Sequence, residues 1–203
     1  CAAPAESTTI PPTILPATLP PTTAPTEISP ATETPSPTAT PVKEIWLPPV
    51  DSSFAWQLGD EINTSFNVDI YDVDAFETEA SLISRLHSEG KKAFCYISVG
   101  SWEDWRPDAA DFPSEIIGND YEGWEGEKWL DIREIEKLAP IMRARLDMCV
   151  EKGFDGIEPD NINLHWTNTG FEISYEDQLA YNIWLSEEAH ARGLSIGLKN
   201  NED

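Results

Sequence analysis

Hydrophobic and polar positions alternate between two kinds of segment from about residue 45 to the end of the sequence. Apolar residues recur at helical spacing in 77–90, 133–153 and 174–193. Short apolar runs bounded by turn residues lie at 54–58, 68–74, 91–100, 154–160 and 194–200. Runs of that kind indicate strands, whereas a period of about 3.6 residues indicates helices. The pattern therefore predicts five strands and three helices.

Local signals mark the ends of the predicted helices. Gly90 follows the first helical segment and suits a C-cap. Ser174 and Asp177 form a capping-box-like pair at the start of the third, and Pro140 predicts a bend in the second. Residues 101–130 are rich in Trp, Asp, Glu, Gly and Pro and have no clear period. We predict one long loop there, which in a compact domain is usually functional.

The order of the elements sets the fold class. Strands that alternate with helices predict βαβ units and a parallel sheet of the α/β class. Five strands fit either an open sheet or the first five β/α units of a (β/α)8 TIM-type barrel. A complete barrel typically needs about 250 residues, and residues 45–203 provide only about 160. Because the sequence ends directly after a strand, we expect the partial barrel, with the edges of its first and fifth strands exposed.

Residues 1–44 have a different composition, dominated by Ala, Pro, Thr, Ser and Glu and without an aromatic residue. Such a segment cannot bury enough apolar surface to offset chain entropy, so we expect a disordered, extended stalk. The segment begins with Cys1, as a bacterial lipoprotein does after removal of its signal peptide. This predicts a lipid anchor and a location outside the cell or on its surface. The alternative is a fragment boundary that happens to fall on Cys1.

The net charge and the cysteine content limit the kinds of binding partner and site that we expect. The formal net charge is −24, nearly all of it in residues 45–203. This argues against nucleic acid as a partner and indicates either a soluble acidic surface or a cleft that attracts cations. Cys95 and Cys149 lie in apolar contexts, and we expect buried free thiols rather than a disulfide or a metal site. We also expect a monomer without a cofactor, in contact with a membrane only through lipid on Cys1.

Polar side chains collect at the carboxyl ends of the predicted strands, where parallel α/β folds place their functional groups. They are Asp72, Asp74, Tyr96, Ser98, Glu158, Asp160, Asn161, Lys199 and Asn200. Glu158 and Asp160 share one face of their strand, about 7 Å apart. Paired carboxylates suit glycoside hydrolysis, although carboxylates at these strand ends could instead bind Mg²⁺ or Ca²⁺. Aromatic faces stack on sugar rings, which favours the first interpretation for a loop that contains Trp102, Trp105, Trp124 and Trp129.

Six stretches carry a family resemblance: WQL (56–58), YDVDAF (71–76), CYISVGSWEDWRPDAADFP (95–113), WLDIR (129–133), GFDGIEPDN (153–161) and AHARGLSIGLKN (189–200). In this order they resemble glycoside hydrolase family 114, which contains endo-α-1,4-polygalactosaminidases. The resemblance covers the chain from about residue 45. It implies a (β/α)8 barrel that hydrolyses a galactosamine-containing polysaccharide.

The resemblance also implies roles for single residues. It places the catalytic nucleophile on Asp160, and substrate-pocket positions on Glu158, Asn161, Asp74, Tyr96, Ser98 and Lys199. The family's general acid is a Glu in an Asn-Glu motif on a later strand. Glu202 follows asparagines but comes too soon after the fifth strand to be equated with it. The chain as given is therefore expected to lack its acid.

A partly deacetylated galactosaminan is a polycation, so the expected partner of the acidic cleft is a cationic amino-sugar polysaccharide. We expect Trp105 in its binding surface and a contact from its amine to Asp72, Asp74, Asp131 or Glu158. Lys199, if it points inward, would stabilise negative charge on Asp160. Three functions stay open: a retaining glycosidase, a non-catalytic carbohydrate-binding lipoprotein on the same fold, and a metal-dependent hydrolase.

Overall fold

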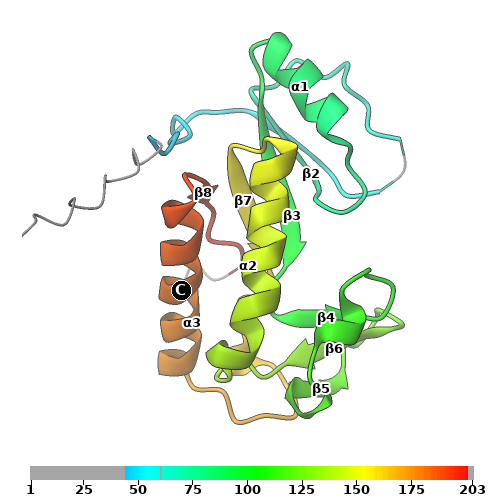
Figure 1. The fold of residues 1–203 in the computed structure, drawn as a ribbon, viewed down its shortest axis with the longest axis vertical. Coiled ribbons are helices and arrows are strands. Elements are labelled where there is room, and N and C mark those ends of the chain that lie inside the picture. Colours follow the sequence, from blue (N-terminus) through cyan, green and yellow to red (C-terminus); the bar gives the residue numbers. More distant parts are fainter. Residues whose placement is uncertain (1–43, 60, 201–203) are drawn as a thin grey trace, which may run out of the picture. The chain divides into compact units, whose positions relative to one another are not determined.

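The computed structural model describes residues 44–59 and 61–200 (Figure 1). Apart from Glu44, the predicted stalk lies outside the described residues, as do Cys1 and Glu202.

A parallel sheet of five strands forms the centre of the fold. Its strands are β1 (Phe54–Gln57), β2 (Ile70–Asp74), β3 (Lys92–Ser98), β7 (Gly156–Asp160) and β8 (Ser195–Ile196). They lie side by side in the order β1-β2-β3-β7-β8, which is also their order along the chain, and every pairing is parallel. This sequential parallel order is that of the first units of a (β/α)8 barrel, so the structure confirms the predicted fold class and the five strands.

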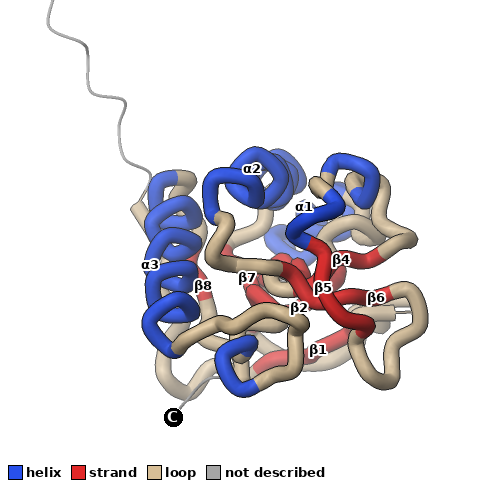
Figure 2. Tube along the Cα trace, turned by 90° about the horizontal axis from the view of Figure 1, so that it is seen from below, coloured by secondary structure: helices blue, strands red, loops and turns tan. Residues whose placement is uncertain are grey.

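Three helices cover one face of this sheet: α1 (Ala80–Ser88), α2 (Ile135–Lys152) and α3 (Tyr175–Ala191). Figure 2 shows them as an arc along one side of the strands, and α2 contacts both α1 and α3. The predicted capping box is present, because Ser174 Oγ accepts from the backbone N–H of Asp177 and Asp177 Oδ2 accepts from the N–H of Ser174. Pro140 lies inside α2.

Successive side chains along the strands point to opposite faces of the sheet, so the apolar core and the polar strand-end residues lie on different faces. Val73, Cys95, Ile97 and Ile157 point toward the helices and are fully buried. Their neighbours Asp72, Asp74, Tyr96, Glu158 and Asp160 therefore project from the opposite face. Burial of the first set holds the strands in register, and that register brings the polar set together. Asp74 lies opposite Tyr96, and Tyr96 opposite Glu158.

Residues 101–130 are not the single loop that the sequence predicted. They contain a three-stranded antiparallel sheet with β6 (Glu127–Leu130) between β4 (Ser101–Glu103) and β5 (Ile117–Asp120). Two short 3-10 helices, Ala109–Asp111 and Ser114–Ile116, connect β4 to β5, and a third follows β7 at Leu164–Trp166. Trp129 is buried on β6, where its ring stacks on Tyr121 with a centroid distance of 4.2 Å. Trp129 is thus a core residue of this small sheet.

Cys95 and Cys149 form a disulfide, which corrects the prediction of two free thiols. Cys95 points from β3 toward the helices, and Cys149 lies on the buried side of α2. Their Cα atoms are 6.1 Å apart, within the range that a disulfide spans. The bond joins a central strand to the helix that covers it.

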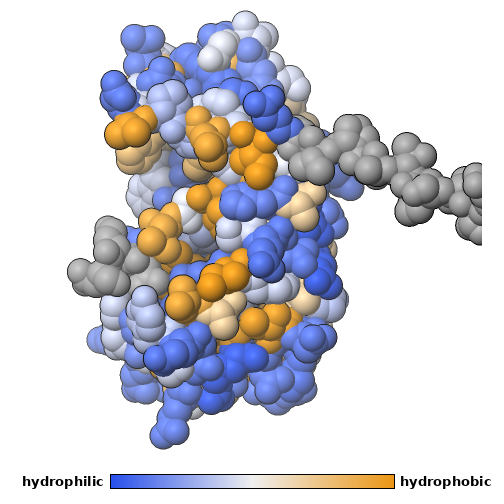
Figure 3. Space-filling model, turned by 90° about the vertical axis from the view of Figure 1, so that its left-hand side faces the viewer, coloured by the Kyte–Doolittle hydropathy of each residue, from blue (hydrophilic) through white to orange (hydrophobic). Residues whose placement is uncertain are grey.

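The surface on the side drawn in Figure 3 is mostly hydrophilic, with separate hydrophobic groups. Exposed apolar residues include Leu179 and Ile183 on α3 and Leu198 after β8. In the described part of the chain, no helix combines the length and apolarity that a membrane span requires.

Candidate active site at the strand ends

A cavity of about 420 Å³ opens at the carboxyl ends of β2, β3 and β7, and we call it the strand-end pocket. The parallel sheet supplies one wall, and the small antiparallel sheet with its connecting segments supplies the other. Its lining residues are Trp56, Leu58, Asp74, Glu77, Tyr96, Glu103, Trp105, Arg106, Tyr121, Trp124, Glu127, Asp160, Asn161, Lys199 and Asn200. The structure thus brings six of the predicted site residues together: Asp74, Tyr96, Trp105, Asp160, Asn161 and Lys199.

Asp160, the last residue of β7, is held through both carboxylate oxygens. The hydroxyl of Tyr96 donates to Oδ2 at 2.7 Å. The backbone N–H of Asn161 donates to Oδ1 at 2.9 Å, and Lys199 Nζ lies 3.6 Å from the same oxygen. Burial and the neighbouring Asp160 raise the pKa of Tyr96 above its ordinary value, so the phenol remains a donor. The carboxylate is oriented and charge-compensated, as a nucleophile requires.

Lys199 points inward and bridges the two acids of β7. Its Nζ lies 3.2 Å from Oε2 of Glu158, and the indole N–H of Trp56 donates to that same oxygen at 2.9 Å. The ammonium also lies over the rings of Trp56 and Tyr96, 4.8 Å and 5.1 Å from their centroids. Glu158 is therefore already paired with a cation of the protein.

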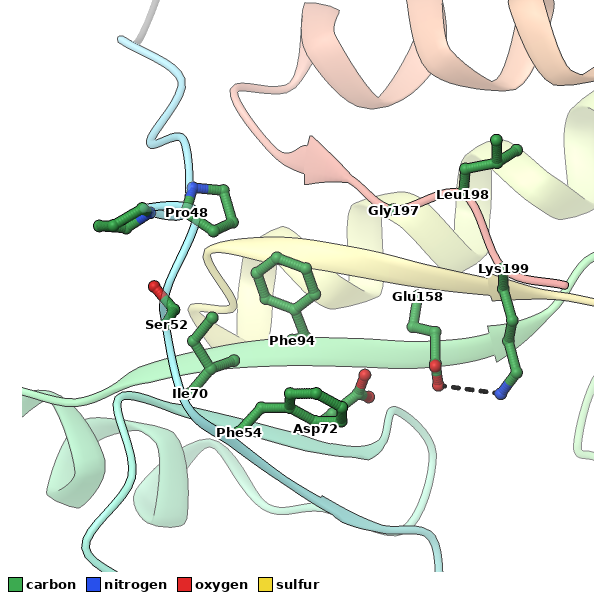
Figure 4. A pocket seen from close by; sticks show the side chains of 11 residues that line it. Pro48, Ser52, Phe54, Ile70, Asp72, Phe94, Glu158, Gly197, Leu198 and Lys199 are labelled. Carbon is green, nitrogen blue, oxygen red and sulfur yellow. Dashed lines mark ion pairs between the residues drawn. The ribbon is translucent and has the colours of Figure 1, made fainter. Parts of the chain in front are cut away.

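Asp72 lies two residues before Asp74 on β2. It lines a second cavity of about 420 Å³ on the same face of the sheet (Figure 4). We call it the sheet-face pocket. It contains Phe54, Phe94 and Leu198 together with Asp72, Glu158 and Lys199. Asp72 is buried, and within residues 44–59 and 61–200 its Oδ1 has no hydrogen-bond partner. Burial, followed by the charge of Glu158, raises the pKa of Asp72 to about 8.

Besides Glu158, two of the predicted amine-binding acids have cationic partners within the protein. Asp74 forms a two-pronged ion pair with Arg106, with N to O distances of 3.0 Å and 2.7 Å, and also accepts two backbone N–H groups. Asp131 does not line the strand-end pocket and pairs with Arg133 at 2.7 Å. Asp155, the first acid of GFDGIEPDN, lies just before β7 and binds Lys92 and His87 at 2.7 Å and 2.8 Å.

Four tryptophans were predicted to form a binding surface, and two of them line the strand-end pocket. Trp105 and Trp124 are 48% and 62% exposed, so their ring faces are available to a ligand. Trp102 is partly buried, and its indole N–H donates to the carbonyl of Ala109. In the described ranges, no group of three or more His, Cys, Asp or Glu side chains is placed to hold a metal ion.

Comparison with known proteins shows the family. The model of glycoside-hydrolase family GH114 matches residues 35–203. The chain belongs to family GH114. Among curated proteins, the comparison found no match.

Two solved structures are similar to this GH114 chain. Ega3 from Aspergillus fumigatus, solved in complex with galactosamine, is 39% identical with a TM-score of 0.75, over 78% of this chain and 63% of that chain. The glycoside hydrolase domain of PelA from Pseudomonas aeruginosa is 15% identical with a TM-score of 0.55, over 71% of this chain and 58% of that chain. At this low sequence identity, the similarity to PelA supports the fold alone. The GH114 chain spans less than two thirds of either relative.

The structure also adds residues that sequence reasoning missed at the GH114 site. Glu103, Arg106 and Glu127 all reach the strand-end pocket from the small antiparallel sheet or its connections. Arg106 binds Asp74 and Glu103, and although burial opposes it, these hydrogen bonds raise the pKa of Arg106. Glu127 and Trp129 are both buried on one face of β6, with the partly buried Lys128 between them, and a strand of four residues is too short for this period-2 pattern to be detected from the sequence.

Ser98 and Asn161 form a buried network with Glu127 behind Asp160. The side-chain amide of Asn161 donates to Ser98 Oγ at 3.0 Å, Ser101 Oγ at 2.9 Å and Glu127 Oε1 at 3.2 Å. The hydroxyl of Ser101 donates to the same Glu127 oxygen. Burial raises the pKa of Glu127; the Ser101 hydrogen bond opposes this, and the charges of Glu103 and Asp160 add to it. Ser98 therefore contributes to the network rather than to the pocket wall.

Proposed function

We propose that this chain is the nucleophile-bearing part of an endo-acting glycoside hydrolase that cleaves α-1,4-linked, galactosamine-containing polysaccharide. The observation that carries the proposal is the environment of Asp160. A carboxylate at a strand end is bound at both oxygens by Tyr96 and Asn161 and faces Lys199 in an open pocket. Membership of GH114 and the galactosamine bound to Ega3 support the substrate class.

The proposed reaction is a double displacement that retains anomeric configuration. An oxygen of Asp160 attacks the anomeric carbon while the bond to the leaving oxygen breaks and a general acid protonates that oxygen. Water then hydrolyses the glycosyl-enzyme ester, with the former acid acting as base. The family resemblance assigns the acid to a Glu on a later strand, so residues 44–59 and 61–200 supply the nucleophile side of the reaction.

The pocket suits a cationic sugar polymer. The exposed Glu77 lines it, and Trp105 and Trp124 expose aromatic rings in the same pocket. Acidic groups at the rim attract ammonium groups, and aromatic rings pack against the apolar faces of sugars. An extended polymer needs an open site of this kind rather than a closed cavity.

We further propose a location outside the cell or at its surface, with Cys1 as the lipid attachment site. The disulfide between Cys95 and Cys149 supports an oxidising compartment, because cytosolic reductants keep most thiols reduced. Mass spectrometry of the native protein from its source cells tests the proposal. A mass increase on the peptide that begins at Cys1 is expected, and an unmodified Cys1 would contradict the anchor.

The test of the activity is release of oligosaccharides from purified galactosaminan by the full-length protein, compared with Asp160→Asn. The variant should lose at least about 10³-fold in rate, since the amide cannot form the ester, yet it should still bind polymer. Asp111→Asn, which changes an exposed aspartate outside the pocket, is the matched control. Wild-type protein that binds galactosaminan but releases nothing would overturn the proposal in favour of a non-catalytic carbohydrate-binding protein. Loss of activity with a chelator would instead favour metal-dependent chemistry.

A further inference from the structure

Asn161 adopts an unusual backbone conformation directly after Asp160. Its φ angle is 63°, in the left-handed region that costs most residues free energy, although Asn tolerates it better than most. Gly100 accommodates this turn, because a Cβ at position 100 would lie 1.7 Å from the carbonyl oxygen of Asn161. The conformation directs the N–H of Asn161 at Oδ1 of Asp160. The residues that fix the position of Asn161 therefore also maintain one of the hydrogen bonds to the proposed nucleophile, Asp160.

The side chain of Asn161 is held by a chain of hydroxyl groups that ends at Glu127. Ser101 donates its hydroxyl hydrogen to Glu127 Oε1, and the Ser98 and Ser101 oxygens lie 2.5 Å apart. Oε1 of Glu127 accepts from both Ser101 and Asn161, and this fixes the direction of the chain. Ser101 donates to Glu127, Ser98 donates to Ser101, and both hydroxyl oxygens keep lone pairs for the Asn161 amide. Glu127 is thus the terminal acceptor of the network.

We propose that Glu127 is a positioning residue that holds Asp160 in its reactive orientation through Asn161. The proposal rests on the function proposed above. Glu127 is only 8% exposed on β6, and its carboxyl group accepts from Asn161, which directly follows β7 of the parallel sheet. The competing role is direct contact between Glu127 and substrate, because the residue also lines the strand-end pocket.

Two substitutions separate positioning from direct contact. Gln at position 127 keeps an acceptor oxygen for Ser101 and Asn161 but carries no charge, whereas Ala removes the acceptor. For positioning, Glu127→Gln should keep kcat within about threefold of wild type. Glu127→Ala should lose about 10- to 100-fold in kcat with KM within about twofold, since a hydrogen bond to a charged group is lost. Glu122→Ala removes an exposed acid from the same hairpin and should leave both constants unchanged.

A second readout needs no activity. The backbone N–H of Asn161 should exchange slowly with solvent in wild type and Glu127→Gln, and faster in Glu127→Ala, by nuclear magnetic resonance of the labelled full-length protein. If wild type is inactive while exchange follows this order, the positioning role stands and the proposed function fails. Unchanged exchange and kcat in Glu127→Ala would overturn the proposal. The proposal would also be overturned if kcat fell as much in Glu127→Gln as in Glu127→Ala while the Asn161 N–H still exchanged slowly. The negative charge of Glu127, rather than its hydrogen bonds, would then be what the reaction needs.

Discussion

The hydroxyl of Tyr96 on β3 lies 2.7 Å from Oδ2 of Asp160 on the neighbouring strand β7. In the sheet, Tyr96 is opposite Glu158 and Ser98 is opposite Asp160, so the phenol reaches diagonally along the pocket wall. This contact places a neutral donor against the carboxylate, on the opposite oxygen from Asn161 and Lys199. The two oxygens of Asp160 are therefore chemically distinct.

Tyr96→Phe should reduce kcat/KM for polymer hydrolysis by about 10- to 100-fold, because a hydrogen bond to a charged acceptor is lost without a change of shape. Initial rates of oligosaccharide release measure the effect. Tyr175→Phe, which alters an exposed tyrosine on α3, should retain the wild-type rate. Equal rates in Tyr96→Phe and wild type would show that the contact has no part in the reaction.

Exposed tryptophans of the pocket should contribute to polymer affinity. Trp124→Ala is expected to weaken binding of galactosaminan by about 3- to 10-fold, consistent with the free energy of one aromatic contact. Titration calorimetry with a defined oligosaccharide gives the dissociation constant. Trp166→Ala is a matched control, since Trp166 is 54% exposed but does not line the strand-end pocket. A similar loss in both variants would assign the effect to general surface adhesion.

The disulfide should stabilise the fold substantially. It closes a loop with a sequence separation of 54, for which the chain-entropy model gives about 4 kcal/mol. Double substitution of Cys95 and Cys149 by Ala should lower the melting temperature, and a reducing agent should lower that of wild type but not of the variant. Alkylation of the unreduced, unfolded protein supplies an independent check. Modification of both Cys95 and Cys149 in that experiment would restore the free-thiol prediction.

Asp72 should make stability depend on pH in the direction opposite to a paired aspartate. Its pKa is about 8 in the folded protein, and an unfolded aspartate has a pKa of about 3.9. The folded state therefore binds more protons between these values, so the free energy of unfolding falls as pH rises from about 4 to 8. Each pH unit in this window contributes at most about 1.4 kcal/mol.

Asp72→Asn removes this dependence. Its melting temperature relative to wild type should increase progressively from pH 4 to 8, whereas Asp111→Asn should follow wild type throughout. Glu158, Asp160 and Lys199 are the charged groups that act on Asp72 and remain in the variant. A constant difference between Asp72→Asn and wild type across the range would contradict the raised pKa of Asp72.

The parallel sheet and much of the strand-end pocket could be predicted because both depend on short-range patterns. Five apolar runs identified the strands, and the convergence of carboxyl ends placed Asp160, Tyr96 and Lys199 in one region. The antiparallel sheet was missed because its strands have only three or four residues, and because β4 pairs with β6 across a long stretch of sequence, with Ser101 opposite Trp129. Glu127 is 26 residues from Ser101, and Arg106 is 32 residues from Asp74. The disulfide was missed for the same reason, since thiol pairing depends on tertiary distance.

The antiparallel sheet β4-β6-β5 is inserted between β3 and α2 and supplies the wall of the strand-end pocket that faces β7, the strand of the proposed nucleophile Asp160. Its hydrogen-bond ladder is separate from that of the parallel sheet, so changes in its turns need not alter the register of β7. Because Trp124 lies in the turn at 120–126 and lines the strand-end pocket, we expect exchange of this turn between homologues to change the proposed polymer preference. Glu127 limits where such a graft can begin, because its carboxyl group belongs to this wall and also accepts from Asn161, which follows the proposed nucleophile Asp160.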